Sequence, residues 1–256
     1  MGHTKMERMR IYTVTHKNFQ PTAESIYQPI IVGNGEVNLS SAVRDNIGDN
    51  ITEKNKSFCE MTALYWIWKN TSFSENDIIG LTHYRRYFKK GVKNIIATEG
   101  DIKKILNSYD IIIPKKRNYY IVSVQEHYKK AHYSKDLMLV REIISNKQSE
   151  YLVHFDNIMN GKTLSLYNMF VTSWGIFESY CNWVFPILFE LDTRIDKEKY
   201  DSYQMRVIGF LAERLFNVWL EGEKNKLKIY EMPVYNTDGE NLIVKGINLI
   251  KRQYCS

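Results

Sequence analysis

A histidine and two arginines follow directly on a short apolar stretch of this sequence, and their side chains could bind a phosphate. Residues 78–82 form an apolar run of strand length, followed by His83, Arg85 and Arg86. Aromatic residues surround them (Tyr84, Tyr87 and Phe88). Each guanidinium can donate paired hydrogen bonds, so the two together suit a phosphate or diphosphate. The alternative is that Arg85 and Arg86 pair with acids on a solvated face.

Residues 80–88 resemble the Gly-Leu-x-His-Tyr-Arg-Arg-Tyr-Phe signature of a bacterial family of capsular and exopolysaccharide glycosyltransferases, some of whose members transfer galactofuranose. Other matching segments are spread along the chain (residues 14–17, 48–51, 59–70, 114–117, 126–128, 166–170 and 200–204). Together they cover roughly residues 10–235 in the expected order, so the resemblance does not rest on one motif.

The resemblance implies an α/β fold of the glycosyltransferase A type, with a single Rossmann-like mixed sheet flanked by helices. It also implies transfer of a hexose, galactofuranose or galactopyranose, from a UDP-sugar to a growing capsular or cell-surface polysaccharide. The acceptor would be a lipid-diphosphate-linked saccharide, and the furanosyl-transferring members suggest inversion of configuration. A different reading is a non-catalytic carbohydrate-binding or polysaccharide-assembly adaptor, which would explain the many aromatic residues without a catalytic base.

Composition and charge narrow the possible partners. The 256 residues are 44% hydrophobic and 25% charged, as in an ordinary globular protein, and we expect one domain over 1–256, with a core at about 10–235. The net charge of +6 fits a phosphorylated ligand or an anionic membrane, whereas no arginine-rich arm indicates nucleic acid. Cys59, Cys181 and Cys255 are widely spaced, which favours reduced thiols and a cytoplasmic location.

The basic amphipathic segment 236–256 could lie on the inner face of the cell membrane or dock on the domain itself. No apolar run is long enough to span a bilayer, and no signal peptide opens the sequence. We therefore expect a cytoplasmic protein with peripheral membrane contact as an option.

Predicted strands at residues 10–15 and 28–32 suit the nucleotide-binding half of such a fold. Thr15, His16 and Lys17 end the first strand, and we expect them to meet the nucleobase or ribose, unless Thr15 only caps a turn. Asp49 and Asn50 lie in the long loop 33–55, where a local turn role competes with the donor or acceptor contact that the resemblance implies.

A helix follows, in which Ser57 and Glu60 have the spacing of a capping box, although Glu60 could also bind ligand. After a helix at 99–108, the strand 109–113 stops at Pro114 and leads into basic residues with two tyrosines behind them (Lys115, Lys116, Arg117, Tyr119 and Tyr120). This basic stretch could bind a diphosphate or an acidic lipid head group, or could be an ordinary solvated loop.

A second capping box, Ser123 with Glu126, opens a helix that carries His127 and His132. Five positions place these two histidines about 140° apart on a helix, so they are not a zinc pair. They could meet a phosphate or a sugar hydroxyl, or serve only in packing. Residues 134–160 are predicted to be helical up to Gly161.

The last third of the chain carries the remaining candidates. Asn168 leads a strand at 168–173, and Pro186 is expected to kink or divide a helix at 175–192. Asp201 is expected to open a helix to about residue 221, and residues 227–235 to form a strand. The resemblance places four polar residues on the acceptor side or directly behind the substrate-binding groups (Glu60, Asn168, Gln204 and Arg206). A plain ion pair between Arg206 and Glu213 is the alternative there.

Sugar transfer needs stabilisation of the departing diphosphate and, with inversion, a base for the acceptor hydroxyl. The Asp-x-Asp motif that binds metal in most A-type enzymes is missing after residue 82, so use of Mg²⁺ or Mn²⁺ stays open. We hypothesise that His83, Arg85 and Arg86 supply the charge instead, since a unit charge at 4 Å contributes about 4 kcal/mol at a dielectric near 20. For the base, Asp201 ranks first, Glu213 second and Asp49 third.

Overall fold

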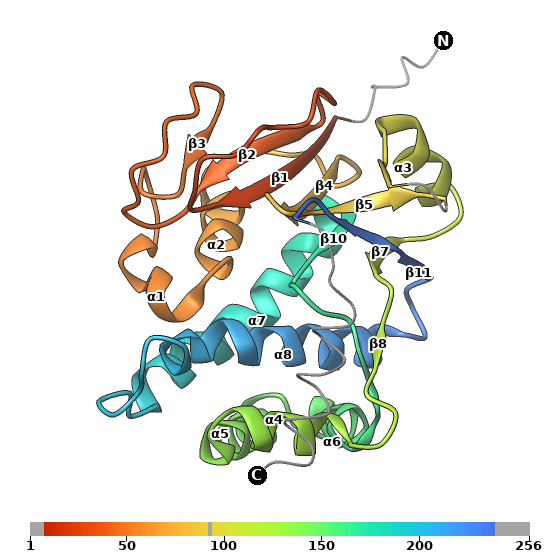
Figure 1. Ribbon diagram of the computed structural model, residues 1–256. Helices are drawn as coiled ribbons and strands as arrows, with labels where there is room; N and C mark the ends of the chain where they lie inside the picture. Colours follow the sequence, from red (N-terminus) through yellow and green to blue (C-terminus); the bar gives the residue numbers. More distant parts are fainter. Residues whose placement is uncertain (1–7, 92–93, 239–256) are drawn as a thin grey trace.

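A computed structural model describes residues 8–91 and 94–238, which form a mixed α/β fold (Figure 1). The central sheet has the strand order β11-β7-β10-β4-β1-β2-β3. Its strands are β1 (Met9–Thr15), β2 (Tyr27–Ile31), β3 (Val43–Arg44), β4 (Ile78–His83), β7 (Ile111–Pro114), β10 (Phe170–Ser173) and β11 (Ile229–Met232). All neighbours are parallel except β10, which runs antiparallel between β4 and β7. The predicted α/β fold with one mixed sheet is confirmed.

The strand behind the histidine and arginines is buried as expected. Every residue from Ile78 to Thr82 is buried, because β4 lies between β1 and β10. Gly80 is required at its position, since a Cβ there would lie 2.9 Å from the carbonyl oxygen of Phe170. The β4 strand is therefore a rigid support for His83 at its carboxyl end.

The chain does not continue as a loop after His83, as the sequence suggested. It reverses over Tyr84 and Arg85 and returns as β5 (Arg86–Lys90), whose pairing with β4 joins His83 to Arg86. The rest of β5 pairs with β12 (Val234–Asn236) and with β6 (Ile95–Ile96). Burial of the Tyr87 and Phe88 side chains explains this additional strand. The single strand expected at 227–235 is divided into β11 and β12 around Pro233, which has no N–H to donate.

The helix expected around residues 57–68 is two helices. After η1 (Thr52–Lys54), the chain forms α1 (Asn55–Phe58) and α2 (Met61–Asn70), separated at Cys59 by a φ of 53°. The predicted capping box of Ser57 and Glu60 is wrong, because Ser57 lies in the last turn of α1. Glu60 is the N-cap of α2, and its side chain bonds to Asn168, a residue far along the chain.

The middle of the chain forms a helical layer below the sheet (Figure 1). The capping box of Ser123 and Glu126 is confirmed at the start of α4 (Val124–Ala131). The helix expected at 134–160 is interrupted at Gln148, where polar residues offer no apolar face for packing. The elements of this part are β8 (Arg117–Asn118), α5 (Ser134–Lys147), η2 (Ser149–Tyr151), α6 (Leu152–Asn160) and β9 (Thr163–Leu164). The helix α3 (Glu99–Leu106) lies beside β5, away from this layer (Figure 1).

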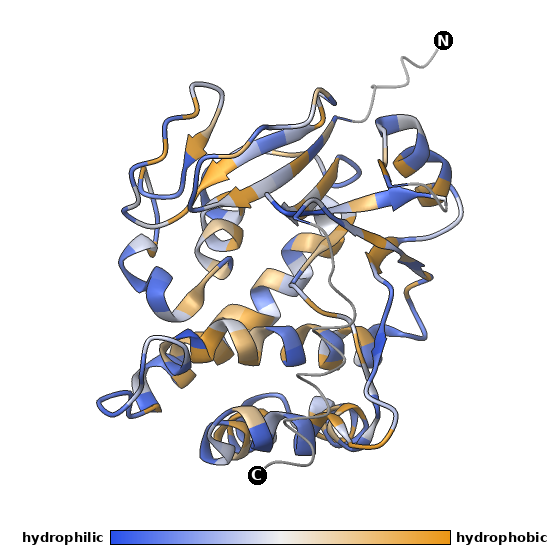
Figure 2. Ribbon diagram, in the orientation of Figure 1, coloured by the Kyte–Doolittle hydropathy of each residue, from blue (hydrophilic) through white to orange (hydrophobic). Residues whose placement is uncertain are grey.

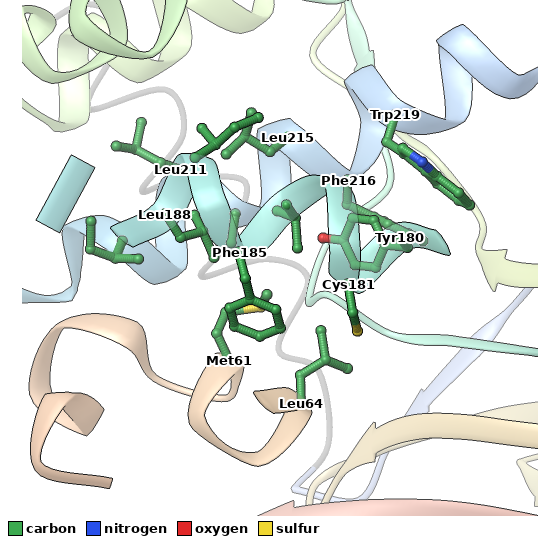
Figure 3. Packing of buried hydrophobic residues seen from close by; sticks show 14 of the residues in the cluster. Met61, Leu64, Tyr180, Cys181, Phe185, Leu188, Leu211, Leu215, Phe216 and Trp219 are labelled. Carbon is green, nitrogen blue, oxygen red and sulfur yellow. The ribbon is translucent and has the colours of Figure 1, made fainter. Parts of the chain in front are cut away.

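Two long helices form the centre of the core. Pro186 does not divide α7 (Trp174–Arg194), because the buried residues around it hold the helix in place. The second helix begins later than expected, with a turn at Asp201, then η3 (Gln204–Arg206) and α8 (Val207–Glu223). Figure 3 shows Phe185 and Leu188 of α7 between α8 and Met61 of α2.

The distribution of hydrophobic residues matches the position of this core. They are concentrated along α7 and in the sheet, whereas the loops and outer helix faces are hydrophilic (Figure 2). Within residues 8–91 and 94–238, no helix has the length and apolar character needed to cross a bilayer. Most of the segment 236–256, which the sequence indicated as a basic amphipathic tail, lies outside the described residues.

Candidate active site

His83 stands at the carboxyl end of β4 and is held in its neutral form. Its Nε2 lies 2.6 Å from the carbonyl oxygen of Tyr167. A carbonyl oxygen only accepts, so Nε2 is the donor of this bond. Burial lowers the pKa of His83 to about 4, although its bond to Tyr167 opposes this effect. His83 is therefore a fixed hydrogen-bonding group rather than a cation near neutral pH.

Arg86 begins β5 next to His83, and its guanidinium is positioned without being neutralised by an ion pair in the described part of the chain. The guanidinium carbon lies 4.3 Å from the centre of the Tyr167 ring, within the range of a cation–π contact. Its Nε is buried and has no hydrogen-bond partner among residues 8–91 and 94–238. This arrangement keeps donors available for an anion.

Arg85 is placed differently from its neighbour. Its side chain is 41% exposed and lies 3.1 Å from a carboxylate oxygen of Asp238. Its guanidinium also lies 5.0 Å from the centre of the Tyr84 ring. An exposed ion pair of this kind contributes little to stability and is readily exchanged, so Arg85 can still turn toward a ligand.

Two glutamates from different helices meet the same region. Glu60 precedes α2 and accepts a hydrogen bond from Nδ2 of Asn168 at 2.7 Å. Glu213 of α8 accepts from the Tyr167 backbone N–H at 2.8 Å and lies 3.2 Å from the buried guanidinium of Arg214. Burial raises the pKa of both carboxyl groups, and the charge of Glu60 raises that of Glu213 further. Such carboxyl groups can exchange protons closer to neutral pH than ordinary glutamates.

Tyr167 and Asn168 connect all these groups. The sequence indicated Asn168 as a candidate, but it did not indicate Tyr167. Their φ angles are 78° and 49°, which is unusual for two adjacent residues other than glycine. Tyr167 bonds through its carbonyl to His83, through its N–H to Glu213 and through its ring to Arg86. Strained backbone of this kind is concentrated at functional sites. Only its place in the matched segment 166–170 could have indicated Tyr167 from the sequence.

The start of α8 lies against Cys59. Nε of Arg206 is 3.5 Å from the Cys59 Sγ, and burial raises the pKa of this thiol to about 12. Gly209 allows the approach, because an added Cβ would lie 3.0 Å from the sulfur. Asn168 Nδ2 also lies 3.5 Å from the Gly209 carbonyl oxygen. Arg206 is thus held beside the residues around Glu60.

The end of β1 lies next to this region. The His16 ring contacts the Tyr84 ring edge-on at 5.5 Å. Burial lowers the pKa of His16, and the positive charges of Lys17, Arg85 and Arg206 lower it further. Thr15 is buried and closes a turn, since its hydroxyl donates to the Lys17 carbonyl at 2.5 Å and accepts from the Lys17 N–H at 3.1 Å. Lys17 therefore adds positive charge at the same edge, whereas His16 adds a neutral ring that can still donate a hydrogen bond.

Asp49 and Asn50 are bonded at the other end of α2. The Asp49 carboxylate accepts from the Tyr65 hydroxyl at 3.1 Å, and its backbone N–H donates to Asn70. Ten residues of helix extend about 15 Å, which separates this end from Glu60. Asn50 closes a local turn through the carbonyl of Gly48 and the N–H of Thr52.

Asp201 caps the turn that leads to η3. Its Oδ1 accepts the backbone N–H groups of Tyr203 and Gln204 at 2.9 and 2.7 Å. The Gln204 side chain accepts from Nδ1 of His132 through its Oε1 at 3.1 Å and donates to the carbonyl of Ala131 through its Nε2 at 2.9 Å. These contacts join the end of α4 to the beginning of α8.

His127 lies on α4 as expected, whereas His132 follows the last residue of the helix with extended backbone, and both make aromatic contacts. The His127 ring stacks on the Tyr119 ring at 4.2 Å, and the His132 ring lies 4.3 Å from the Phe210 ring.

A further acid, not expected from the sequence, is Asp45 after β3. It is buried, and burial raises its pKa while the Thr52 and Thr62 hydroxyls donate to it. Asp45 ties the long loop to α2.

A hollow with a volume of about 720 Å³ lies apart from this site, between α5 and the end of α7. Its arginines already have partners: Arg141 binds Asp156 through two bonds of 2.8 Å, and Arg194 lies 2.6 Å from Glu142. Three acids, Asp136, Glu142 and Asp196, also line the hollow, and their negative charge disfavours an anion there. At β4, by contrast, the buried Nε of Arg86 has no hydrogen-bond partner in the described part of the chain. Among residues 8–91 and 94–238, no group of three His, Cys, Asp or Glu side chains is placed to hold a metal ion.

Comparison with known proteins identifies a solved structure with a similar fold. A structure described as the apo form of the WbbM bifunctional glycosyltransferase superposes with a TM-score of 0.83 and 28% sequence identity. The match covers 91% of this chain and 46% of that longer one, so the chain spans about half of its length. The fold is that of a glycosyltransferase.

Residues 10–226 match the family described as a domain of unknown function, DUF4422. The chain therefore belongs to this family. No match was found among curated proteins.

Proposed function

We propose that the chain is a glycosyltransferase that moves a hexose from a UDP-sugar to a saccharide acceptor. The observation that carries this proposal is the convergence of Arg86, His83 and Glu213 on Tyr167 at the carboxyl edge of β4. Ligands of open α/β sheets bind at that edge. The similarity to half of a bifunctional glycosyltransferase supports the same conclusion.

In this proposal Arg86 binds the diphosphate of the donor. Its unused Nε donor can serve the leaving group as negative charge develops there. Arg85 and His16 add donors from the turn after β4 and the end of β1. The neutral His83 fixes the Tyr167 carbonyl and thereby the Tyr167 ring on which Arg86 lies.

Glu213 is the carboxylate that we propose as the base for the acceptor hydroxyl, with inversion of configuration. It is bonded to Tyr167 and lies in the electrostatic field of His83 and Glu60. Asp201, the first choice from the sequence, and Asp49, the third, both have carboxylates engaged in hydrogen bonds away from Tyr167. Glu60 and Asn168 then hold the segment around Tyr167 in place.

The sugar that we propose is galactofuranose or galactopyranose, and the acceptor a lipid-diphosphate-linked saccharide of a capsular or cell-surface polysaccharide. Both follow from the resemblance of residues 80–88 to the capsular glycosyltransferase signature. We further propose that the guanidiniums replace a divalent metal. Loss of turnover in EDTA and its return with Mn²⁺ would contradict that part alone.

Nucleotide binding provides the direct test. We expect UDP and a UDP-sugar to raise the Tm of the full chain, and UDP release to require an added saccharide acceptor. Stabilisation by UDP should be lost in Arg86→Gln. Indifference of the Tm to every nucleotide would instead favour a carbohydrate-binding adaptor.

A further inference from the structure

The turn between β8 and α4 presents two adjacent large apolar side chains to solvent. Tyr120 is 74% exposed and Ile121 is 68% exposed, whereas Tyr119 and Val124 on either side are buried. In Figure 1 the chain between β8 and α4 lies at the lower right edge of the molecule, away from the sheet. Single exposed apolar residues are common, but two neighbours at the tip of a turn indicate a contact surface.

The backbone of this turn is strained in a way that holds both side chains outward. The Ile121 N–H donates to the Tyr119 carbonyl at 2.7 Å, which closes a turn of only three residues. Tyr120 at its centre has a φ of 57°, where a residue other than glycine is disfavoured by about 1 kcal/mol. The side chain of Asn118 supports it by accepting the Tyr120 N–H at 2.7 Å. A flexible, solvated loop would have no need of this conformation.

Basic residues flank the turn in the sequence. All of them are exposed: Lys115, Lys116 and Arg117 before it, and Lys129 and Lys130 on α4 after it. The single acid between residues 115 and 131 is Glu126, which is bonded to Ser123 in the capping box. Of the basic residues, Lys116 lies 3.8 Å from Glu231. The turn therefore combines an apolar tip with a positively charged base.

We propose that this turn docks the protein on an anionic phospholipid bilayer, with Tyr120 and Ile121 inserted at the level of the head groups. Aromatic and aliphatic side chains favour that depth, and nearby basic residues are attracted to anionic lipids. A stable protein partner would need roughly 800 Å² on each side, much more than two side chains offer. A nucleic acid would use the basic residues but not Ile121.

The sheet topology places the carboxyl end of β7, from which the chain leads to the turn, on the same edge as the candidate active site. β4 and β7 are both antiparallel to β10, so their carboxyl ends lie on one edge. The chain that leads to the turn leaves β7 at Pro114. The Pro114 carbonyl accepts a hydrogen bond from the hydroxyl of Ser165 at 2.9 Å, and Ser165 lies two residues before Tyr167 in the sequence. Docking would hold that edge near the bilayer, where a lipid-linked acceptor would be found. The docking itself does not depend on the proposed reaction.

Sedimentation of the full chain with vesicles tests the proposal. We expect binding to vesicles of phosphatidylcholine with phosphatidylglycerol, and much less to phosphatidylcholine alone. The double variant Tyr120→Ser with Ile121→Ser should reduce the bound fraction at least tenfold. Ile47→Ser is the matched control, because Ile47 is 67% exposed but precedes α1, and it should bind like the wild type. Lys129→Gln with Lys130→Gln should weaken binding roughly tenfold, and more at low salt.

Three results would overturn the proposal. They are absence of binding of the wild type to anionic vesicles, equal binding of the tip variant and Ile47→Ser, and tip-dependent binding of single-stranded oligonucleotide in place of vesicles. The Tm of each variant should match the wild type, since the substituted side chains are exposed. UDP release with a water-soluble acceptor should also be unchanged in the tip variant, which separates this proposal from the proposed reaction.

Discussion

The polar residues of this chain form two groups that differ in how far apart their bonded partners lie in the sequence. The first group joins segments at least 46 residues apart (Glu60 to Asn168, His83 to Tyr167 and Glu213 to Tyr167). The second group closes turns of two or three residues (Thr15 to Lys17, Asn50 to Thr52 and Asp201 to Gln204). Both groups look alike in the sequence, yet only the first converges on one place.

The distance between bonded partners indicates which of these side chains can take part in catalysis. A side chain that caps its own turn stabilises local backbone, and its orientation is set by that turn. A side chain held by a distant segment is oriented by the whole fold, so its geometry can be maintained while a ligand binds. We therefore expect substitutions in the first group to affect turnover and those in the second to affect mainly local structure.

The largest expected effect concerns the two acids. Glu213→Gln should lower kcat roughly 1,000-fold, because a proposed base loses its proton-accepting form while its bond to Tyr167 is kept. Asp201→Asn should lower kcat less than about tenfold, since the asparagine oxygen still accepts both N–H bonds of the turn. Steady-state measurement of UDP release checks both. The reverse ranking would show that the locally bonded acid is the base.

The next largest effect is expected for the two arginines, which differ in how they are held. Arg86→Gln should lower kcat/KM for the donor about 100-fold, because the stacked guanidinium with its free Nε is lost. Arg85→Gln should lower it only a few-fold, about as expected for an exposed charge. Initial rates at several donor concentrations measure both values. Equal losses would mean that the stack on Tyr167 gives Arg86 no advantage.

The two asparagines offer a test by stability. Asn168→Ala removes the donor to the partly buried Glu60 at a position with φ of 49°, so the free energy of unfolding should fall by about 1–3 kcal/mol. Asn50→Ala in its exposed turn should lower it by less than about 1 kcal/mol. Urea denaturation followed by circular dichroism provides the numbers. A larger loss of unfolding free energy for Asn50→Ala would contradict the expectation that Asn168, which is bonded to a distant segment, matters more than Asn50, which closes a local turn.

The smallest expected effect is a pH dependence due to His83. Its pKa is about 4 in the folded protein and about 6.5 when unfolded, so the unfolded state binds the proton first and stability is lost as pH falls from 7 toward 4. Relative to His83→Gln, the wild type should lose about 1–2 kcal/mol of unfolding free energy between pH 7 and 5. Parallel urea curves at the two pH values measure it. A constant difference would mean that His83 titrates normally.

Features set by local sequence could be predicted. The buried run 78–82 has the length of a central strand and forms β4, and Ser123 with Glu126 has the spacing of a capping box and forms one. The resemblance of residues 80–88 to a known signature also led to the fold that the comparisons support. In each case the pattern that carried the prediction lies within a few neighbouring residues.

Features set by distant contacts could not be predicted in the same way. Ser57 and Glu60 have the same spacing as Ser123 and Glu126, but the turn at Cys59 places Glu60 against Asn168. The return of the chain as β5 depends on pairing with β12, about 150 residues further along. Tyr167 gives no signal by residue type, because its contribution comes mainly from its backbone groups and its conformation.

The most direct test of the central claim is a structure of the full chain with UDP bound. The account predicts that the diphosphate lies within hydrogen-bonding distance of the Arg86 guanidinium, at the carboxyl edge of β4 beside Tyr167. A diphosphate bound instead in the hollow between α5 and α7, with Arg86 turned away from it, would contradict the account.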